Sequence, residues 1–211
     1  MNKGDDIIKE IHDLLDDRVD GFMESIPKVQ RQAYEEVLIL AKELDTNKDG
    51  TIKPTLKNVK MIAKIKQRLN EVIIDGRYMK ELQKVVDTYE KIAVLQNSYF
   101  TAMVGQFGIP SVLAEIQKQS IEITVESLGK NGLNAGVINK VRDILNKNVT
   151  TGGKISSFME EVRLYLLDSP DGDGALKKYT GQIVTDALNQ YSRQYNQILT
   201  DDLGFKFFRY S

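Results

Sequence analysis

Oxygen-bearing side chains occur at every second position of one short stretch, at Asp45, Asn47 and Asp49. These are positions one, three and five of an EF-hand calcium loop, and Gly50 occupies position six, where that loop turns sharply. Position twelve, which needs a carboxylate that supplies two oxygens, is Leu56. Asp, Asn and Gly also favour ordinary turns. We therefore favour a turn between two helices and keep a calcium site as the alternative.

Positive side chains are concentrated in the segment that follows this stretch. Apolar residues recur beside them at helical spacing, at Val59, Ile62, Ile65, Leu69 and Val72. No aromatic side chain is interleaved to stack on nucleotide bases. The pattern favours the solvated face of an amphipathic helix, and phosphate contact with a nucleic acid is the alternative. The positive residues are Lys57, Lys60, Lys64, Lys66 and Arg68.

Sequence signatures of catalysis are absent. The chain has no cysteine and a single histidine, His12, and it contains no glycine-rich phosphate loop, nucleophile elbow or zinc signature. Adjacent acids such as Glu35 and Glu36 point to different sides of a helix, so they cannot share one substrate. We expect no enzyme activity and no cofactor other than the calcium considered above.

The composition is that of a protein with a buried core and no dominant charge. Of the 211 residues, 41% are hydrophobic, and the 29 lysines and arginines nearly balance the 30 aspartates and glutamates. The net charge of −1 therefore gives no global field to attract nucleic acid or acidic lipid. No run of about 18 apolar residues occurs, so no membrane-spanning helix is expected.

Periodic apolar residues predict an all-α fold, an elongated multi-helix bundle with helical hairpins. One amphipathic helix covers Ile7 to Leu15, and a second is predicted to begin near Pro27, because proline is tolerated in a first helical turn. The most regular seam is Tyr78, Leu82, Val85, Tyr89, Ile92, Gln96 and Tyr99. Its polar member, Gln96, either sets the register or marks where the seam reaches solvent, and we favour the second.

Two regions are predicted, an N-terminal helical region over residues 1–104 and a second region over residues 105–211. The boundary rests on Gly105, Gly108 and Pro110, which interrupt the helical pattern. The second region ends in an aromatic, strand-like segment that contains Phe205, Phe207, Phe208 and Tyr210. An exposed strand seeks a partner. We expect either further chain or another subunit to cover this segment.

The order of elements in the last 80 residues resembles the helical part of phage Mu F-like minor head proteins. The resemblance rests on a helix over residues 132–148 that begins at a glycine, a turn over 149–153, a short capped helix over 156–167, and a long helix over 179–203. An aromatic, strand-like segment over residues 205–210 completes it. A looser match extends into the helical region before it.

This resemblance implies a structural component of the phage virion. Family members associate with the portal and other head proteins in a multi-copy assembly, and they aid head assembly or DNA packaging and delivery. The implied location is the phage head or neck, after assembly in the host cytoplasm. Tyr and Arg are enriched at protein interfaces. The residues expected to form interfaces are Tyr179, Tyr191, Arg193, Tyr195, Phe205, Phe207 and Phe208.

Overall fold

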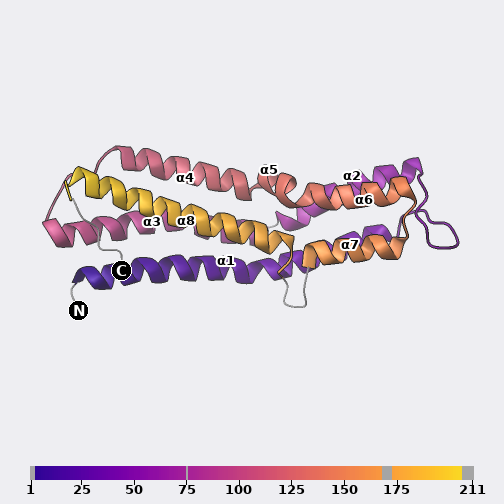
Figure 1. Cartoon of the computed structure of the whole chain (residues 1–211), viewed down its shortest axis with the longest axis horizontal. Coiled ribbons are helices and arrows are strands. Elements are labelled where there is room, and N and C mark those ends of the chain that lie inside the picture. The colour runs from indigo at the N-terminus through magenta and orange to yellow at the C-terminus, as the bar shows by residue number, and fades with distance from the viewer. Residues whose placement is uncertain (1–2, 75, 168–172, 206–211) are drawn as a thin grey trace.

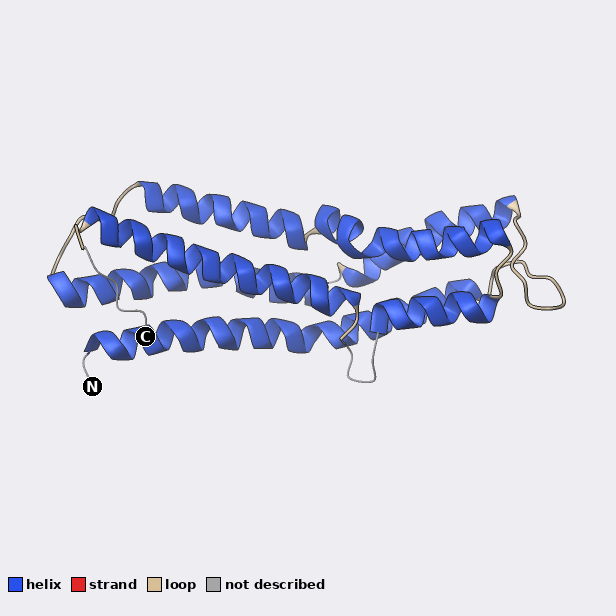
Figure 2. Cartoon of the chain, in the orientation of Figure 1, coloured by secondary structure: helices blue, strands red, loops and turns tan. Residues whose placement is uncertain are grey.

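The chain is all-α, as predicted. The computed structural model describes residues 3–74, 76–167 and 173–205. Within these ranges there is no strand, only helices and the loops that join them (Figure 2). The elements are α1 (Lys3–Ala41), α2 (Leu56–Ile73), α3 (Gly76–Val104), α4 (Val112–Leu128), α5 (Lys130–Leu133), the π-helical turn η1 (Asn134–Ile138), α6 (Asn139–Thr151), α7 (Ile155–Leu167) and α8 (Ala175–Asp202).

The helices form four long segments that run up and down along one axis (Figure 1). The first segment is α1, the second is α2 followed by α3, the third runs from α4 to α6, and the fourth is α7 followed by α8. The second and fourth segments both pack on α1, and the third packs on the second and fourth. The predicted elongated bundle is therefore confirmed.

One continuous helix, α1, replaces the two helices predicted on either side of Pro27. A proline inside a helix lacks the N–H that would bond the carbonyl four residues earlier, and it costs about 3 kcal/mol or more. The fully buried residues Phe22, Ile26 and Val29 continue one apolar face through the proline. Ser25 also donates its hydroxyl to the Phe22 carbonyl at 2.7 Å. Burial of this face on both sides of Pro27 outweighs the lost hydrogen bond, so the predicted break was wrong.

The other three segments are interrupted part-way along α1 (Figure 1). The Tyr78 hydroxyl donates to the Leu128 carbonyl at 2.8 Å, and the Tyr179 hydroxyl donates to the Ser127 carbonyl at 3.1 Å. Gln30, which is fully buried on α1, accepts a hydrogen bond from the Lys177 backbone N–H in the first turn of α8 at 2.7 Å. We call this level the waist.

The waist divides the bundle into two halves. The loop half contains residues 28–41 of α1 together with α2, α6, α7 and the loops between them. The opposite half contains residues 3–27 of α1 together with α3, α4, α5, η1 and α8. The predicted boundary between residues 104 and 105 falls at the end of α3, and helices from both predicted regions pack together in each half.

The predicted seam of α3 lies in the core. Tyr78, Leu82, Val85, Tyr89 and Ile92 are all buried, and the last member, Tyr99, is half-buried. Gln96 is also buried and donates from its side-chain amide to the carbonyl and the hydroxyl of Ser192 on α8. The expectation that the seam reaches solvent at Gln96 was therefore wrong, because this amide links α3 to α8 inside the bundle.

The predicted strand-like segment at the end of the sequence lies almost wholly outside the described residues. Phe207, Phe208 and Tyr210 belong to the undescribed range, 206–211. Phe205 is described and is half-buried, with its ring centroid 6.1 Å from that of Phe100. Phe205 thus adds to the core at the end of α8.

Candidate functional site

The stretch with calcium-loop spacing forms the connection between α1 and α2 at one end of the bundle (Figure 1). It folds back on itself, with an antiparallel bridge between Thr46 and Ile52 and a positive φ of 81° at Gly50. The fully buried Ile52 donates its N–H to the Gly153 carbonyl at 2.9 Å. The connection between α1 and α2 is thereby fastened to the connection between α6 and α7.

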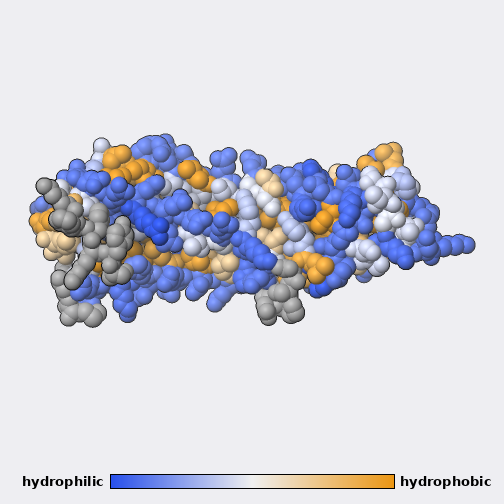
Figure 3. All heavy atoms as spheres, viewed as in Figure 1, coloured by the Kyte–Doolittle hydropathy of each residue, from blue (hydrophilic) through white to orange (hydrophobic). Residues whose placement is uncertain are grey.

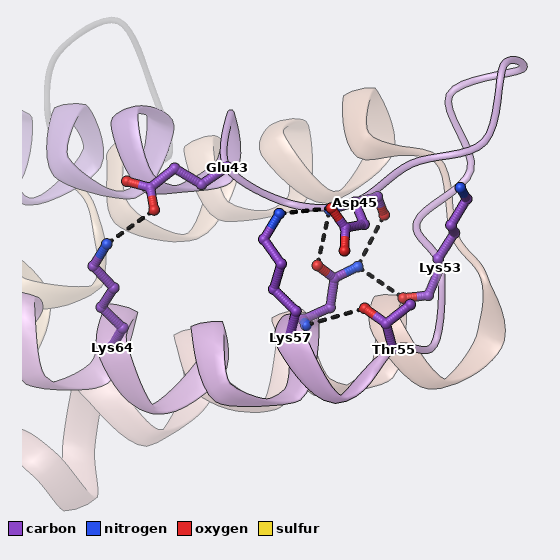
Figure 4. Close-up of polar contacts among 7 residues, drawn as sticks. Glu43, Asp45, Lys53, Thr55, Lys57 and Lys64 are labelled. Carbon is purple, nitrogen blue, oxygen red and sulfur yellow. Dashed lines mark hydrogen bonds and ion pairs between the residues drawn. The ribbon is translucent and has the colours of Figure 1, made fainter.

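Asn58 closes this loop from within. It is fully buried in the first turn of α2, where Thr55 caps the helix by accepting a hydrogen bond from the Asn58 N–H. The Asn58 side-chain carbonyl accepts from the Asp45 N–H at 2.9 Å. Its amide donates to the carbonyls of Asp45 and Lys53, at 2.9 and 2.7 Å. Figure 4 shows Asp45, Lys53 and Thr55 gathered around this point.

The carboxylates of the loop already have protein partners. Asp45 pairs with Lys57 Nζ at 2.6 Å (Figure 4), and the hydrogen bond from this lysine lowers the pKa of Asp45. Asp49 accepts hydrogen bonds from the hydroxyl and the N–H of Thr51, at 2.7 and 3.1 Å, which lower the pKa of Asp49. The Asn47 amide donates to the Thr51 hydroxyl at 2.8 Å. All three predicted ligand side chains thus have hydrogen-bond partners within the protein, in the loop or at the start of α2.

These contacts agree with the turn that we favoured over the calcium site. Leu56 at position twelve is 71% exposed and supplies no oxygen. Across the described ranges, no three His, Cys, Asp or Glu side chains are grouped so that they could hold a metal ion. The loop is therefore closed by Asn58 and by backbone bridges.

The positive side chains of α2 largely bind acids of α1 and its following loop. Lys64 pairs with Glu43 at 2.9 Å (Figure 4). Arg68 donates two hydrogen bonds of 2.9 Å to Glu36 and also forms an ion pair with Glu71. The hydrogen bonding from Arg68 lowers the pKa of Glu36. With the pair between Lys57 and Asp45, these contacts fasten α2 to α1. These ion pairs support the predicted solvated face of α2. They also leave fewer unpaired positive side chains on α2 to contact a nucleic acid.

The tyrosines of α8 that were predicted to form an interface lie inside the bundle. Tyr191 is 1% exposed and Tyr195 is 3% exposed, and their rings pack edge to face with centroids 5.7 Å apart. Tyr179 is half-buried at the waist, and Arg193 alone of the four residues is exposed. Tyr191 and Tyr195 cannot be a docking surface of the folded chain, because they are buried against α3.

Polar groups are embedded in this aromatic core. The ring of Tyr89 lies 4.8 Å from that of Tyr191, and its hydroxyl is 2.6 Å from the Thr124 hydroxyl. The Tyr195 hydroxyl donates to Asn97 Oδ1 at 3.1 Å. By contrast, the buried Tyr191 hydroxyl finds no hydrogen-bond partner among the described residues. Burial raises the pKa of each of these three tyrosines.

Exposed apolar side chains lie instead at the end of α3, on α4 and in the turn between them. Helical spacing from Leu113 and Leu128 predicts that Ile123 is buried, but it is 63% exposed, so that prediction was wrong. Ile109 and Val112 flank Pro110 in a segment without charges. Figure 3 shows apolar surface over α4. The exposed residues are Met103, Val104, Ile109, Val112, Ile123 and Val125.

Comparison with known proteins found no match to this chain among family models, curated proteins or solved structures. Of the helices in the described ranges, none is both long and apolar enough to cross a membrane.

Proposed function

We propose that this chain is a structural protein that binds other proteins within a large assembly. The resemblance of residues 132–210 to Mu F-like proteins suggests that the assembly is a phage head or neck. The chain would then be a minor head protein beside the portal, where it would aid head assembly or DNA packaging and delivery. The proposal includes no enzyme activity.

The exposed apolar flank of α4 is the observation that carries this proposal. Ile109, Val112 and Ile123 are 59%, 49% and 63% exposed. Val112 and Ile123 are eleven residues apart, close to three turns of 3.6 residues, so they lie on one side of α4, and Ile109 lies in the connection just before this helix. Contiguous exposed apolar surface is a mark of protein interaction sites. We infer that the portal protein packs against this flank.

The alternative, a calcium-dependent binding module, has less support. Its ligands would be Asp45, Asn47 and Asp49, whose side chains are engaged by Lys57 and Thr51. A cation at this point would have to displace those contacts and would still lack the carboxylate at position twelve.

Co-sedimentation with a phage portal protein tests the proposal. We expect the chain to sediment with the portal, and Val112→Asp with Ile123→Asp to abolish binding, because each aspartate would bring a charge into an apolar contact. Ala114→Asp is the matched control, since it adds a charge at an exposed position on the other side of α4. Equal binding by all variants, or none by the wild type, would contradict the proposal.

A further inference from the structure

Opposite charges are separated along the bundle, although the whole chain is nearly neutral. The loop half, residues 28–74 and 139–167, contains 15 lysines and arginines and 9 aspartates and glutamates. The opposite half is described over residues 3–27, 76–138 and 173–205. It contains 12 lysines and arginines and 18 aspartates and glutamates. The formal charges of the two halves are therefore +6 and −6.

The negative charge is most concentrated on α1. Six exposed carboxylates follow one another at alternating steps of four and three residues, so they lie on a single stripe about 27 Å long at 1.5 Å per residue. Within the described ranges, one carboxylate of the stripe forms an ion pair. This is Asp13, in a long contact of 3.9 Å with Lys9. The acidic stripe consists of Asp6, Glu10, Asp13, Asp17, Asp20 and Glu24.

The loop half has an excess of cations after its own ion pairs are formed. Its acids are mostly engaged, as Glu36, Glu43 and Asp45 are by α2. Several exposed lysines form no ion pair in the described part of the chain. On α2, Lys60 lies between Lys57 and Lys64 at steps of three and four, the same steps that separate the carboxylates of the acidic stripe. The unpaired exposed lysines are Lys28, Lys42, Lys48, Lys53, Lys60, Lys140 and Lys154.

We propose that two copies of this chain pair side by side in antiparallel orientation, with the acidic half of each along the basic half of the other. Antiparallel pairing opposes unlike charges at both ends at once, whereas parallel pairing would oppose like charges at both ends. Single exposed ion pairs contribute little to stability, so the pairing depends on many of them together and is weakened by salt.

A second copy fits this surface better than a nucleic acid does. A polyanion would be attracted to the loop half and repelled by the acidic stripe, whereas a second copy satisfies both halves. No aromatic side chain lies among the lysines of α2 to stack on bases. A surface hollow on α2 places Leu56 and Met61 beside Lys57, Lys60 and Lys64, which suits a partner helix with both apolar and acidic side chains.

This pairing involves the chain alone and goes beyond the proposed role in a phage head. Molar mass by light scattering or sedimentation velocity measures it without any portal protein. At about 50 mM salt we expect a mass near two chains of 23.9 kDa, and at about 500 mM, where the Debye length is only a few ångströms, a mass near one chain.

Charge reversal makes the test specific. The first variant combines Glu10→Lys, Asp17→Lys and Asp20→Lys, and the second combines Lys53→Glu, Lys60→Glu and Lys140→Glu. All six positions are exposed. Each variant alone should remain a monomer at low salt, because the three reversals bring the formal charge of its altered half to zero and so remove the attraction between unlike halves. An equimolar mixture should form a heterodimer, since the unaltered loop half of the first variant (+6) can lie along the unaltered opposite half of the second (−6).

A control for nonspecific charge effects is the triple change Glu115→Lys, Glu122→Lys and Glu126→Lys on α4. It changes the net charge as much as the first variant does but leaves the acidic stripe intact, so we expect it to weaken pairing less. If the chain does not bind the portal protein, the proposed pairing of two copies still stands, because the two experiments measure different complexes.

Three results would overturn the proposal. The first is a wild-type mass of one chain at low salt, and the second is a mixture of the two variants that does not pair. The third is a wild-type monomer that binds a short DNA duplex, with binding lost in the second variant, which would make the loop half a nucleic-acid surface instead.

Discussion

The side chain of Asn58 bonds the backbone of Asp45 in both directions, accepting from its N–H and donating to its carbonyl, each at 2.9 Å. One buried amide thus satisfies both polar groups of a loop residue thirteen positions away. In an EF-hand, a cation organises the loop. Here, a neutral side chain in the next helix does so, together with the Thr46–Ile52 bridge.

Replacing Asn58 should therefore destabilise the chain markedly. Asn58→Ala would leave the Asp45 N–H without its partner and would remove one of the two hydrogen bonds that the carbonyls of Asp45 and Lys53 each accept. Because unsatisfied buried polar groups are costly, we expect the free energy of unfolding to fall by about 2–4 kcal/mol. Val59→Ala is the control at the adjacent, half-exposed position, with a change of about 0.5 kcal/mol or less. Denaturant unfolding measures both, and equal effects would refute the role of Asn58.

Calcium should leave the stability of the chain unchanged. A ligand that binds only the folded state raises its stability by mass action, by about 2.7 kcal/mol at one hundred times its Kd. Because Lys57 and Thr51 already engage the loop carboxylates, we expect no change in Tm on adding millimolar calcium or a chelator. A rise in Tm with calcium that Asp49→Asn abolishes would show a calcium site and would reverse our preference for the turn.

The two buried tyrosines of α8 should respond differently to loss of their hydroxyl groups. Tyr191→Phe removes a hydroxyl that has no partner in the described core, so we expect unchanged stability or a gain of up to about 1 kcal/mol. Tyr195→Phe removes the hydrogen bond to Asn97, and a loss of about 0.5–1.5 kcal/mol is expected. Thermal or denaturant unfolding distinguishes them. A larger loss for Tyr191→Phe would reveal a partner for its hydroxyl.

Alkaline pH should unfold the chain through its buried tyrosines. Burial raises the pKa of Tyr78, Tyr89 and Tyr191 above the ordinary value of 10.0. Above pH 10, the unfolded chain loses protons that the folded chain keeps, so unfolding is favoured. The free energy of unfolding should thus be unaffected by these groups below about pH 10 and fall above it. Absorbance titration of tyrosinate alongside circular dichroism checks this, since ionisation of every tyrosine near pH 10 without unfolding would be the contrary result.

Periodicity alone was sufficient for the fold class, because apolar residues on long helices must face a core. The failure at Pro27 has a tertiary cause. A proline ends most helices, yet Phe22, Ile26 and Val29 are buried on both sides of it. The strength of that packing depends on α3 and α8, which local sequence does not show.

The candidate site shows a second limit. Val59 was assigned to the apolar face of α2 because it is apolar, but it is half exposed, and the buried position is the adjacent Asn58. The spacing of Asn58 from Ile62 and Ile65 was a usable signal, and its polarity concealed it. The tyrosines of α8 were misplaced for the opposite reason. Their suitability for interfaces was weighed above their helical spacing, which indicated a core face.

The molar mass of the portal assembly, measured by light scattering with and without this chain, tests the central claim most directly. The measurement belongs at about 500 mM salt, where charge-driven pairing of the chain with itself is screened. Our account predicts that the portal assembly gains mass in multiples of 23.9 kDa and that the gain disappears with Val112→Asp and Ile123→Asp. A portal mass that does not change, with the chain eluting separately, would contradict it.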